Sequence, residues 1–401
     1  MAKLENYRQF SGRAPVSASI AHALDYQGVR APHTGLPYSE ALLAGVAGGI
    51  SFGYFIFHYK GYNPQVNILT RNTFHTYGWD AIVNRLRIAQ DVINSTNPQK
   101  AEEKLIETLE EGLVPIILAD VFTLAYEHSE FGENMWAMQP MTVIEYSPES
   151  DRALTADRSL CPHEFSAQLL HKARGRVKKY RYRMFVLSPP DENSLKEAVL
   201  TGLQETVSLF TEKPPKGSAN NFGLKAYEAI INDLEMKGRN AWNKRFTNSG
   251  ELSSALLTAY KHSSLFWKDA REGSDRMLFR DFLNEAAEIL ENTALREVGG
   301  QFAKAAELWQ NLADLLLPES IPELAALRSL MNERNNLFIN TGAASIADLR
   351  VLDQKIEGAI SGSGREVYEN AEKILEPVAE QFRKIAIVEE DAISLLRSAI
   401  T

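Results

Sequence analysis

The sequence predicts an α+β protein, with a mixed α/β half up to about residue 190 and an all-helical half after it. In the first half, short apolar runs typical of buried strands alternate with amphipathic helical segments. From residue 194 to residue 401, almost every segment repeats its apolar residues at the 3.6-residue period of a helix. The composition changes at Ser188-Pro189-Pro190. We therefore place one domain at residues 1–190 and a second at residues 191–401.

The first half opens with two predicted helices and a strand. A small-residue helix is expected at 16–26, and a second helix begins near Ser39 and Glu40 and stops at the glycines that follow residue 47. The aromatic run at 52–59 is typical of a buried strand. Further strands are expected at 66–69, 114–121, 140–146, 153–156 and 180–187, and further helices at 78–94, 98–112 and 162–173.

The second half is predicted to contain only helices. They are expected at 195–210, 224–237, 252–267, 277–290, 294–317, 321–337, 347–360 and 365–400, with proline or glycine at several of the breaks between them. The last helix carries an apolar stripe, which is compatible with a homodimer. The sequence shows no fixed-period repeat, and this disfavours a solenoid.

Composition narrows the classes of function. A net charge of −9 argues against general nucleic-acid binding, and the single cysteine rules out a disulfide framework or a Cys-rich metal site. The chain shows no zinc, EF-hand, dinucleotide or phosphate-loop pattern, so we expect no metal and no cofactor. The uncharged stretch at 41–57 is rich in glycine, which favours a buried core segment over a membrane helix. We expect a cytoplasmic protein without a membrane partner.

A set of motifs runs through the first half. It begins with Gly12-Arg13, continues with Ser39-Glu40-Ala41, Gly48-Gly49 and Phe52-Gly53-Tyr54-Phe55, and extends through Val114-Pro115-Ile116 with Asp120 and Val143-Ile144-Glu145-Tyr146 to Asp157. These motifs resemble the N-terminal domain of the butirosin-biosynthesis acyltransferase (BtrH-like) family. The helical half, most clearly residues 303–316, resembles the domain of unknown function that usually follows it.

The resemblance implies a papain-like cysteine fold with a catalytic triad. The family's nucleophilic Cys lies at a helix N-terminus, where the helix dipole lowers the thiol pKa, and a His and an Asp lie on two successive strands. In this chain the Cys position falls on Pro15 and the His position on Gln139, while Asp157 keeps the third position. Neither proline nor glutamine can take over the lost role. The family's thiol-dependent acyl transfer is therefore not expected here.

These considerations give the candidate site residues. For a catalytic role we name Asp157, Gln139 and Ser17, because a carboxylate and an amide can orient an amide or amine and a serine lies beside the lost Cys position. For substrate binding the candidates are Arg13, Pro15, Ser19, His22, Tyr54 and Glu145. Each also has a structural interpretation, such as helix capping for the serines or core packing for the histidine and tyrosine.

Two other features have functional interpretations. Cys161 with His163 could form a displaced nucleophile pair, although residues so close in sequence seldom face each other productively. Residues 172–183 contain seven basic side chains in an acidic protein. They could dock an acidic carrier protein or an anionic substrate, or simply form a solvated helix end and an edge strand whose Lys179, Arg181 and Arg183 share a face.

The leading functional hypothesis is a natural-product biosynthetic enzyme that acts on an acyl, amide or amine substrate without a cysteine nucleophile. The alternative is an inactive family member that binds a ligand or a partner protein, with a cleft filled by side chains such as Phe10, Tyr54 and Trp136. A third hypothesis is a serine-dependent acyltransferase or hydrolase that uses Ser17 or Ser19.

Overall fold

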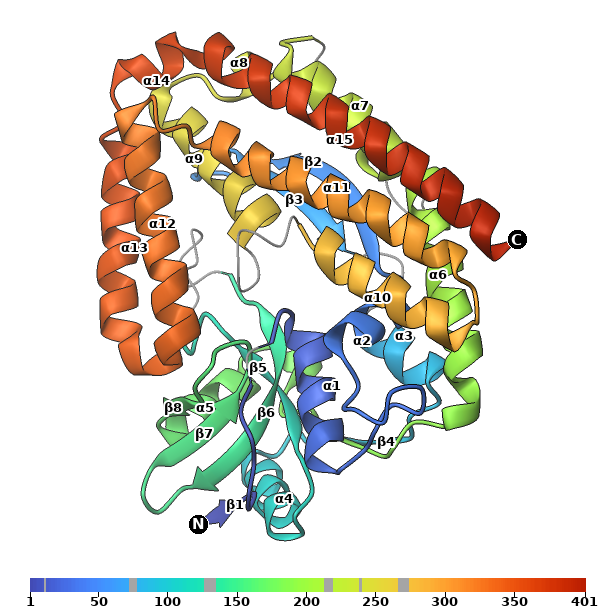
Figure 1. The fold of residues 1–401 in the computed structure, drawn as a ribbon. Helices are drawn as coiled ribbons and strands as arrows, with labels where there is room; N and C mark the ends of the chain where they lie inside the picture. The colour runs from blue at the N-terminus through green and yellow to red at the C-terminus, as the bar shows by residue number, and fades with distance from the viewer. Residues whose placement is uncertain (11, 72–77, 126–134, 213–218, 238–239, 266–273) are drawn as a thin grey trace. The chain divides into compact units, whose positions relative to one another are not determined.

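The computed structural model describes residues 1–10, 12–71, 78–125, 135–212, 219–237, 240–265 and 274–401 (Figure 1). It contains an antiparallel sheet region followed by a helical region, which confirms the α+β class with a helical C-terminal part. Two compact units are formed: unit 1 from Met1–Glu40, Leu86–Ser194 and Arg334–Asp353, and unit 2 from Ala41–Arg85, Leu195–Glu333 and Gln354–Thr401. Both units are assembled from separate stretches of chain, and the domain boundary near residue 190 stays a prediction.

Unit 1 is built on an antiparallel sheet. Its strand order is β4 (Gln90–Ile93), β9 (Met184–Leu187), β5 (Ile116–Asp120), β6 (Met138–Ser147), β7 (Arg152–Ala156) and β8 (His163–Phe165), and β1 (Ala2–Lys3) pairs with β6. The hairpin of β6 and β7 confirms the predicted one, and Thr142 lies opposite Ala156 in its register. Strand β5 pairs with β6 on the other side.

Three helices pack on this sheet. Helix α1 (Pro15–Tyr26) lies along β6, α4 (Pro98–Glu110) packs against β6 and β1, and α5 (Ala167–Gly175) packs against β5 and β7. The segment from Arg334 to Asp353 joins unit 1 through the short 3₁₀ helix Gly342–Ser345, which contacts β8. Gly342 has φ +54°, and a Cβ there would come within 2.8 Å of the His163 ring, so this approach requires glycine.

The predicted helix at 78–94 is wrong in its second half. Helix α3 (Gly78–Arg85) ends at Arg85, and β4 follows after Arg87, which has φ +48°. The four residues of β4 pair with β9 at the edge of the sheet. Tertiary strand pairing therefore overrides the helical periodicity that continues through Ile88.

Two further boundaries differ from the prediction at residues 162–187. The helix expected at 162–173 starts only at Ala167, because β8 comes first and the Ser166 hydroxyl caps α5 by accepting a bond from the Leu169 N–H (3.1 Å). The strand expected at 180–187 starts at Met184, after a 3₁₀ turn at Lys178–Tyr180 and a positive φ at Tyr182. Lys179, Arg181 and Arg183 therefore do not share one face of a strand.

Unit 2 combines a two-stranded hairpin with helices. The hairpin pairs β2 (Ile50–Phe57) with β3 (Gln65–Arg71). The helices are α2 (Glu40–Val46), α3, α6 (Leu195–Thr211), α7 (Gly223–Leu234), α8 (Trp242–Arg245), α9 (Ser249–Tyr260), α10 (Arg276–Ile289), α11 (Ala294–Leu316), α12 (Pro322–Thr341), α13 (Ile346–Ser361), α14 (Arg365–Glu369) and α15 (Ala371–Ile400), of which α2, α12 and α13 also contribute residues to unit 1. The predicted helix at 365–400 is interrupted at Asn370, and the end of the one predicted at 252–267 lies outside the described residues.

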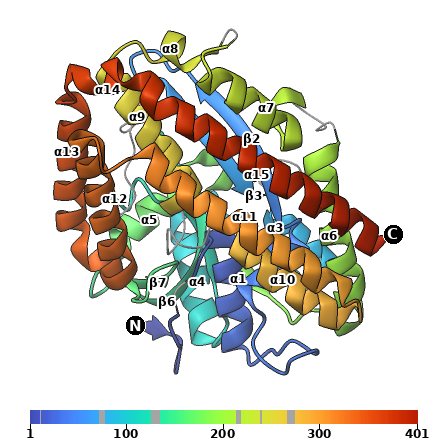
Figure 2. The same ribbon diagram turned by 45° about the horizontal axis from the view of Figure 1, so that its top comes forward.

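The long helices of unit 2 pack side by side. Helix α11 lies between α10 and α15, and α15 also contacts α7, which in turn covers β2 (Figures 1 and 2). Aromatic rings fill the space between them: Phe52 of β2 stacks on Tyr227 at 3.7 Å, and Trp309 meets Phe382 edge-to-face at 5.8 Å. Within the ranges that the structure describes, no helix combines the length and the apolar character needed to cross a membrane.

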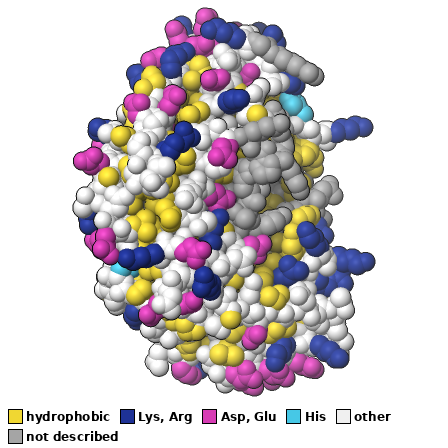
Figure 3. Space-filling model, turned by 90° about the vertical axis from the view of Figure 1, so that its right-hand side faces the viewer, with side chains coloured by type: hydrophobic (Ala, Val, Ile, Leu, Met, Phe, Trp, Pro, Cys, Tyr) yellow, Lys and Arg dark blue, Asp and Glu magenta, His cyan; other side chains and the backbone are white. Residues whose placement is uncertain are grey.

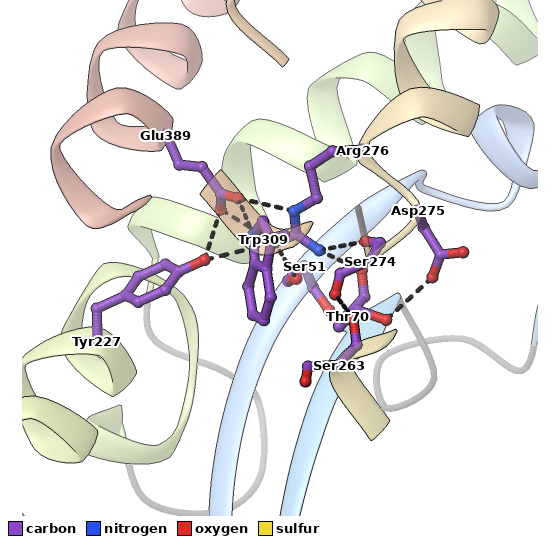
Figure 4. Close-up of polar contacts among 9 residues, drawn as sticks. All are labelled: Ser51, Thr70, Tyr227, Ser263, Ser274, Asp275, Arg276, Trp309 and Glu389. Carbon is purple, nitrogen blue, oxygen red and sulfur yellow. Dashed lines mark hydrogen bonds and ion pairs between the residues drawn. The ribbon is translucent and has the colours of Figure 1, made fainter. Parts of the chain in front are cut away.

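A buried ion pair lies at the centre of unit 2 (Figure 4). Arg276 and Glu389 are both fully buried, and the guanidinium donates from Nε and Nη2 to the two carboxylate oxygens at 2.7 and 3.0 Å. The Tyr227 hydroxyl and the Trp309 indole N–H donate to the same carboxylate at 2.7 and 2.8 Å. Glu389 thus accepts hydrogen bonds from three different helices.

The guanidinium also ties the hairpin to the helices. Its Nη1 donates to the carbonyl oxygens of Thr70 (3.2 Å) and Ser274 (2.8 Å), and Nη2 donates to that of Ser51 (3.1 Å). Burial by itself would lower the pKa of Arg276, but the adjacent Glu389 carboxylate raises it above its ordinary value. The side chain therefore stays charged, and its N–H groups connect β2, β3 and α10 to Glu389 on α15.

Breaking this pair should destabilise unit 2 strongly. We expect Glu389→Gln to lower the free energy of unfolding by about 3–5 kcal/mol, because it leaves a buried guanidinium without its counter-charge. Urea denaturation followed by circular dichroism measures the change. The control is Arg296→Met, which removes the half-exposed pair with Glu288 (3.1 Å) and should cost less than about 1 kcal/mol. Equal losses in the two variants would contradict this prediction.

Candidate functional site at the start of helix α1

The N-terminus of α1 is capped by a side chain from elsewhere in the chain. Ala14 is the N-cap residue and offers no side-chain acceptor, and Pro15 follows at the first helical position. The Glu40 carboxylate takes over the capping role. It accepts bonds from the backbone N–H groups of Arg13 (2.8 Å) and Ala14 (3.3 Å) and from the Ser17 hydroxyl (2.8 Å).

This arrangement is favourable on electrostatic grounds. A helix N-terminus carries a partial positive charge, so a carboxylate is stabilised there. Pro15 has no N–H group to satisfy, and its fixed φ suits the first turn. Ser17 is buried, with 3% of its surface exposed, and its hydroxyl hydrogen points to Glu40. The structure therefore brings three predicted site residues, Arg13, Pro15 and Ser17, together around Glu40.

Glu40 is not among the site residues that the sequence predicts. It lies at the predicted start of the second helix and within the motif Ser39-Glu40-Ala41. The motif was the available signal, because it places a carboxylate at the start of a predicted helix. The sequence could not show that the Glu40 side chain contacts residues 13–17, which lie more than twenty positions earlier in the chain.

The segment before α1 lies against the end of β7. The Gly12 N–H donates to the carbonyl oxygen of Arg158 at 3.2 Å, and the Gln9 amide donates to that of Ser159 at 2.8 Å. Asp157, directly before these residues, is 2% exposed, and the Arg158 Nε lies 3.2 Å from its carboxylate. The segment that leads into α1 and Asp157 are thus close neighbours.

Gln139 lies at the matching end of β6. It stands opposite Ala119 of β5 in the strand register and three residues before Thr142, which pairs with Ala156 of β7. Because the strands are antiparallel, Gln139 and Asp157 lie at the same end of the β6–β7 pair. The two predicted catalytic residues on strands therefore share one end of the sheet.

His22 and Ser19 lie further along α1 and are buried. His22 Nδ1 makes a short hydrogen bond with the Tyr7 hydroxyl, and Nε2 lies 3.1 Å from the Phe10 carbonyl oxygen. Burial lowers the pKa of His22 to about 4, so its ring is neutral at pH 7. Ser19 is 2% exposed, and its hydroxyl has no hydrogen-bond partner among the described residues.

The remaining binding candidates are held by partners of their own. Glu145 on β6 forms an ion pair with Arg152 on β7, and Arg152 also reaches Glu164 (3.2 Å). Tyr54 belongs to unit 2, where its hydroxyl donates to Asp233 (3.1 Å) and accepts from the Trp242 indole (3.0 Å). Glu145 and Tyr54 are thus each engaged by side chains of their own unit.

The structure gives Cys161 and His163 hydrogen-bond partners of their own. The Cys161 thiol donates to the Asn340 carbonyl oxygen (3.1 Å). His163 Nδ1 accepts from the Ala343 N–H (2.9 Å), and Nε2 lies 3.3 Å from the Ser159 hydroxyl. Burial lowers the pKa of His163 to about 3. These contacts fasten residues 334–353 to unit 1, which is a structural role.

The basic stretch at 172–183 is divided between the interior and the surface. Arg174 is buried beside the Tyr182 ring (5.8 Å), whereas Lys172, Lys178 and Lys179 are exposed. On the face that Figure 3 shows, basic side chains are interspersed with acidic ones. Among the described residues, no three His, Cys, Asp or Glu side chains are arranged to hold a metal ion.

Comparison with known proteins supports the resemblance that the motifs indicated. Residues 16–158 match the model of the family described as Butirosin biosynthesis protein H, N-terminal. The match begins one residue after Pro15 and ends one residue after Asp157, so it covers α1 from its second residue and the β6–β7 hairpin. This part of the chain is therefore similar to the N-terminal domain of that family. No curated protein matches the chain.

The pKa of His22 predicts a loss of stability in acid. Its value of about 4 lies below the ordinary value of about 6.5, so the unfolded chain binds the proton more readily. Stability is complete above pH 6.5 and falls as the pH drops towards 4. The expected contribution is about 3 kcal/mol, and urea denaturation at pH 7 and pH 4 measures it.

A histidine variant isolates this effect. In His22→Gln the loss in the free energy of unfolding between pH 7 and pH 4 should be smaller than in the wild type by about 3 kcal/mol. Gln99→Ala provides the control, because it changes an exposed side chain that carries no titrating group. An identical pH dependence in wild type and His22→Gln would show that the ring is not held neutral.

The capping role of Glu40 can be tested separately. Glu40→Ala removes the acceptor of two backbone N–H groups and one hydroxyl, and we expect a loss of about 1–3 kcal/mol in the free energy of unfolding. Glu110→Ala is the control, because this exposed glutamate ends α4 and should cost less than about 0.5 kcal/mol. Hydrogen exchange of the Arg13 and Ala14 amides should accelerate only in Glu40→Ala.

Proposed function

We propose that the chain acts in the biosynthesis of a small-molecule natural product. We further propose that its papain-like N-terminal domain binds an acyl, amide or amine compound without forming a covalent intermediate. The family match supports the first part. The observation that carries the second is the contact between Glu40 and the start of α1. By the resemblance, Pro15 holds the position where the family has its nucleophile, and the hydroxyl of Ser17 is bound to a carboxylate.

The charge at the helix N-terminus also favours binding over acyl transfer. In a thiol enzyme this end of the helix stabilises a thiolate or a developing oxyanion. Here the Glu40 carboxylate neutralises the same partial charge from within the chain. A second negative charge beside it would be repelled, so the surroundings of Ser17 disfavour a tetrahedral oxyanion.

Gln139 and Asp157 supply the recognition in this proposal. A glutamine amide can donate to and accept from an amide group, and a carboxylate can bind an amine. Both residues lie at one end of the β6–β7 pair, next to the start of α1. An exposed basic surface around Lys172, Lys178 and Lys179 could dock the acidic carrier protein that presents such a compound.

A serine-dependent enzyme is the second candidate, favoured by one observation. The Ser17 hydroxyl donates to the Glu40 carboxylate at 2.8 Å, which is the contact that a general base makes with its nucleophile. Against it stand the burial of Ser17 and the neutralised helix end. Attack by Ser17 on a thioester would transfer the hydroxyl proton to Glu40, form an acyl-serine ester and release a thiolate.

Intact-mass spectrometry distinguishes the two candidates. For mass spectrometry, the protein is incubated with acyl-N-acetylcysteamine thioesters. In separate calorimetric titrations, the matching primary amides and amines are added to the protein. We expect saturable binding of at least one compound, no acyl adduct and no labelling by a fluorophosphonate. Gln139→Ala should weaken the binding about tenfold, because it removes the donor and acceptor of the amide. Gln99→Ala, an exposed glutamine of α4, is the control.

Each contrary result has a defined meaning. If the wild type forms an acyl adduct and Ser17→Ala does not, the proposal of non-covalent binding is rejected in favour of the serine mechanism. Binding unchanged in both Gln139→Ala and Asp157→Asn would reject the assignment of the site to the end of β6 and β7.

A further inference from the structure

A cavity of about 530 Å³ opens beside the second half of α1. It is lined by Glu5, Asn6, Arg8, His22, Asp25, Tyr26 and Arg30. Its volume is within the range of small-molecule sites. The lining residues from α1 begin at His22, seven residues after Pro15, which corresponds to about 10 Å along the helix. The cavity is therefore distinct from the candidate site at the start of α1.

Asp25 organises the charged part of the cavity. Its side chain is 8% exposed and receives two guanidinium groups, Arg8 Nη2 at 2.9 Å and Arg30 Nη1 at 3.1 Å. Arg8 and Arg30 are themselves 72% and 43% exposed. A buried carboxylate thus holds two exposed arginines at one opening, although the arginines come from segments on either side of α1. Each guanidinium has five N–H donors, and Asp25 occupies only a part of them.

The charged side chains that line the cavity are Glu5, Asp25, Arg8 and Arg30, two negative and two positive. Glu5 has a partner outside the lining, because it forms an ion pair with Lys3 at 3.2 Å. The group of Arg8, Arg30 and Asp25 therefore keeps an excess of one positive charge. His22 adds none at pH 7, because burial lowers its pKa to about 4. A cationic ligand would face this surplus, whereas a ligand with one anionic group would neutralise it.

We propose that this cavity binds a small molecule through one carboxylate or phosphate group held by Arg8 and Arg30. The planar guanidinium fork matches the oxygen geometry of both groups. Tyr26 supplies a wall against which the body of the ligand can pack. The inference goes beyond the proposed function, since it concerns another part of unit 1 and holds whether or not the start of α1 is catalytic.

Titration calorimetry with three matched probes tests the proposal. Benzoate and phenyl phosphate present the two anionic groups on the same ring, and benzyl alcohol presents no charge. At constant ionic strength and pH 7, we expect saturable one-to-one binding of at least one anion, and the stronger of the two identifies the ligand class. Benzyl alcohol should not bind at the same concentrations.

Variants connect the binding to this cavity. The double variant Arg8→Gln with Arg30→Gln should weaken the anion at least about tenfold, because both charge-assisted contacts are lost. Arg87→Gln is the control, since Arg87 is an exposed arginine of unit 1 that pairs with Asp191 (3.5 Å). Should the double variant not fold, Arg8→Gln alone, whose side chain is mostly exposed, should weaken binding about threefold. Absence of saturable binding by either anion, or equal binding by the variants and the wild type, would overturn the proposal.

Discussion

The buried ion pair between Arg276 and Glu389 is the interaction on which unit 2 depends. A charge removed from water is tolerated only where partners replace the lost hydration, and here every partner comes from a different element. The guanidinium reaches backbone carbonyls of β2 and β3, while the carboxylate accepts from α7, α10 and α11. The hairpin and four helices are therefore fixed by one charged contact as well as by their apolar faces (Figure 4). Apolar packing alone specifies such a position less precisely, because hydrophobic contact is not directional.

The same constraint shapes the start of α1 in unit 1. The first turn of a helix needs acceptors for its free N–H groups and favours negative charge. In this chain Glu40 supplies the negative charge and accepts from the N–H groups of Arg13 and Ala14 directly before the helix, and Ser17 completes the arrangement. A position that in a thiol enzyme would be left open for chemistry is thus satisfied by the protein itself. By contrast, the two arginines on Asp25 are largely exposed and exceed the charge of their partner, which is why an anionic ligand is expected there and not at the helix start.

Local sequence signals predicted most of the fold. Helix α1 follows from its small residues and Pro15, α4 from the proline at its start, and the β6–β7 hairpin from alternation around a turn. The errors have a common cause. At residues 90–93 and 163–165 the chain forms strands because a neighbouring strand is available, and at Arg87 and Tyr182 a positive φ redirects the backbone. Neither the neighbour nor the φ value can be read from periodicity.

That Pro15 and Gln139 stand at the positions of the family's nucleophile and base stays a prediction from the resemblance. The sequence by itself determined the motifs that carry this resemblance and the position of the one cysteine, Cys161. It also determined the class of fold, because helical periodicity and strand alternation are local properties. Only the tertiary structure decided that Glu40 caps α1, that His22 is neutral between Tyr7 and Phe10, and that Arg8 and Arg30 meet at Asp25. These contacts join residues from separate segments, and their energies depend on burial, which exists only after the chain has folded.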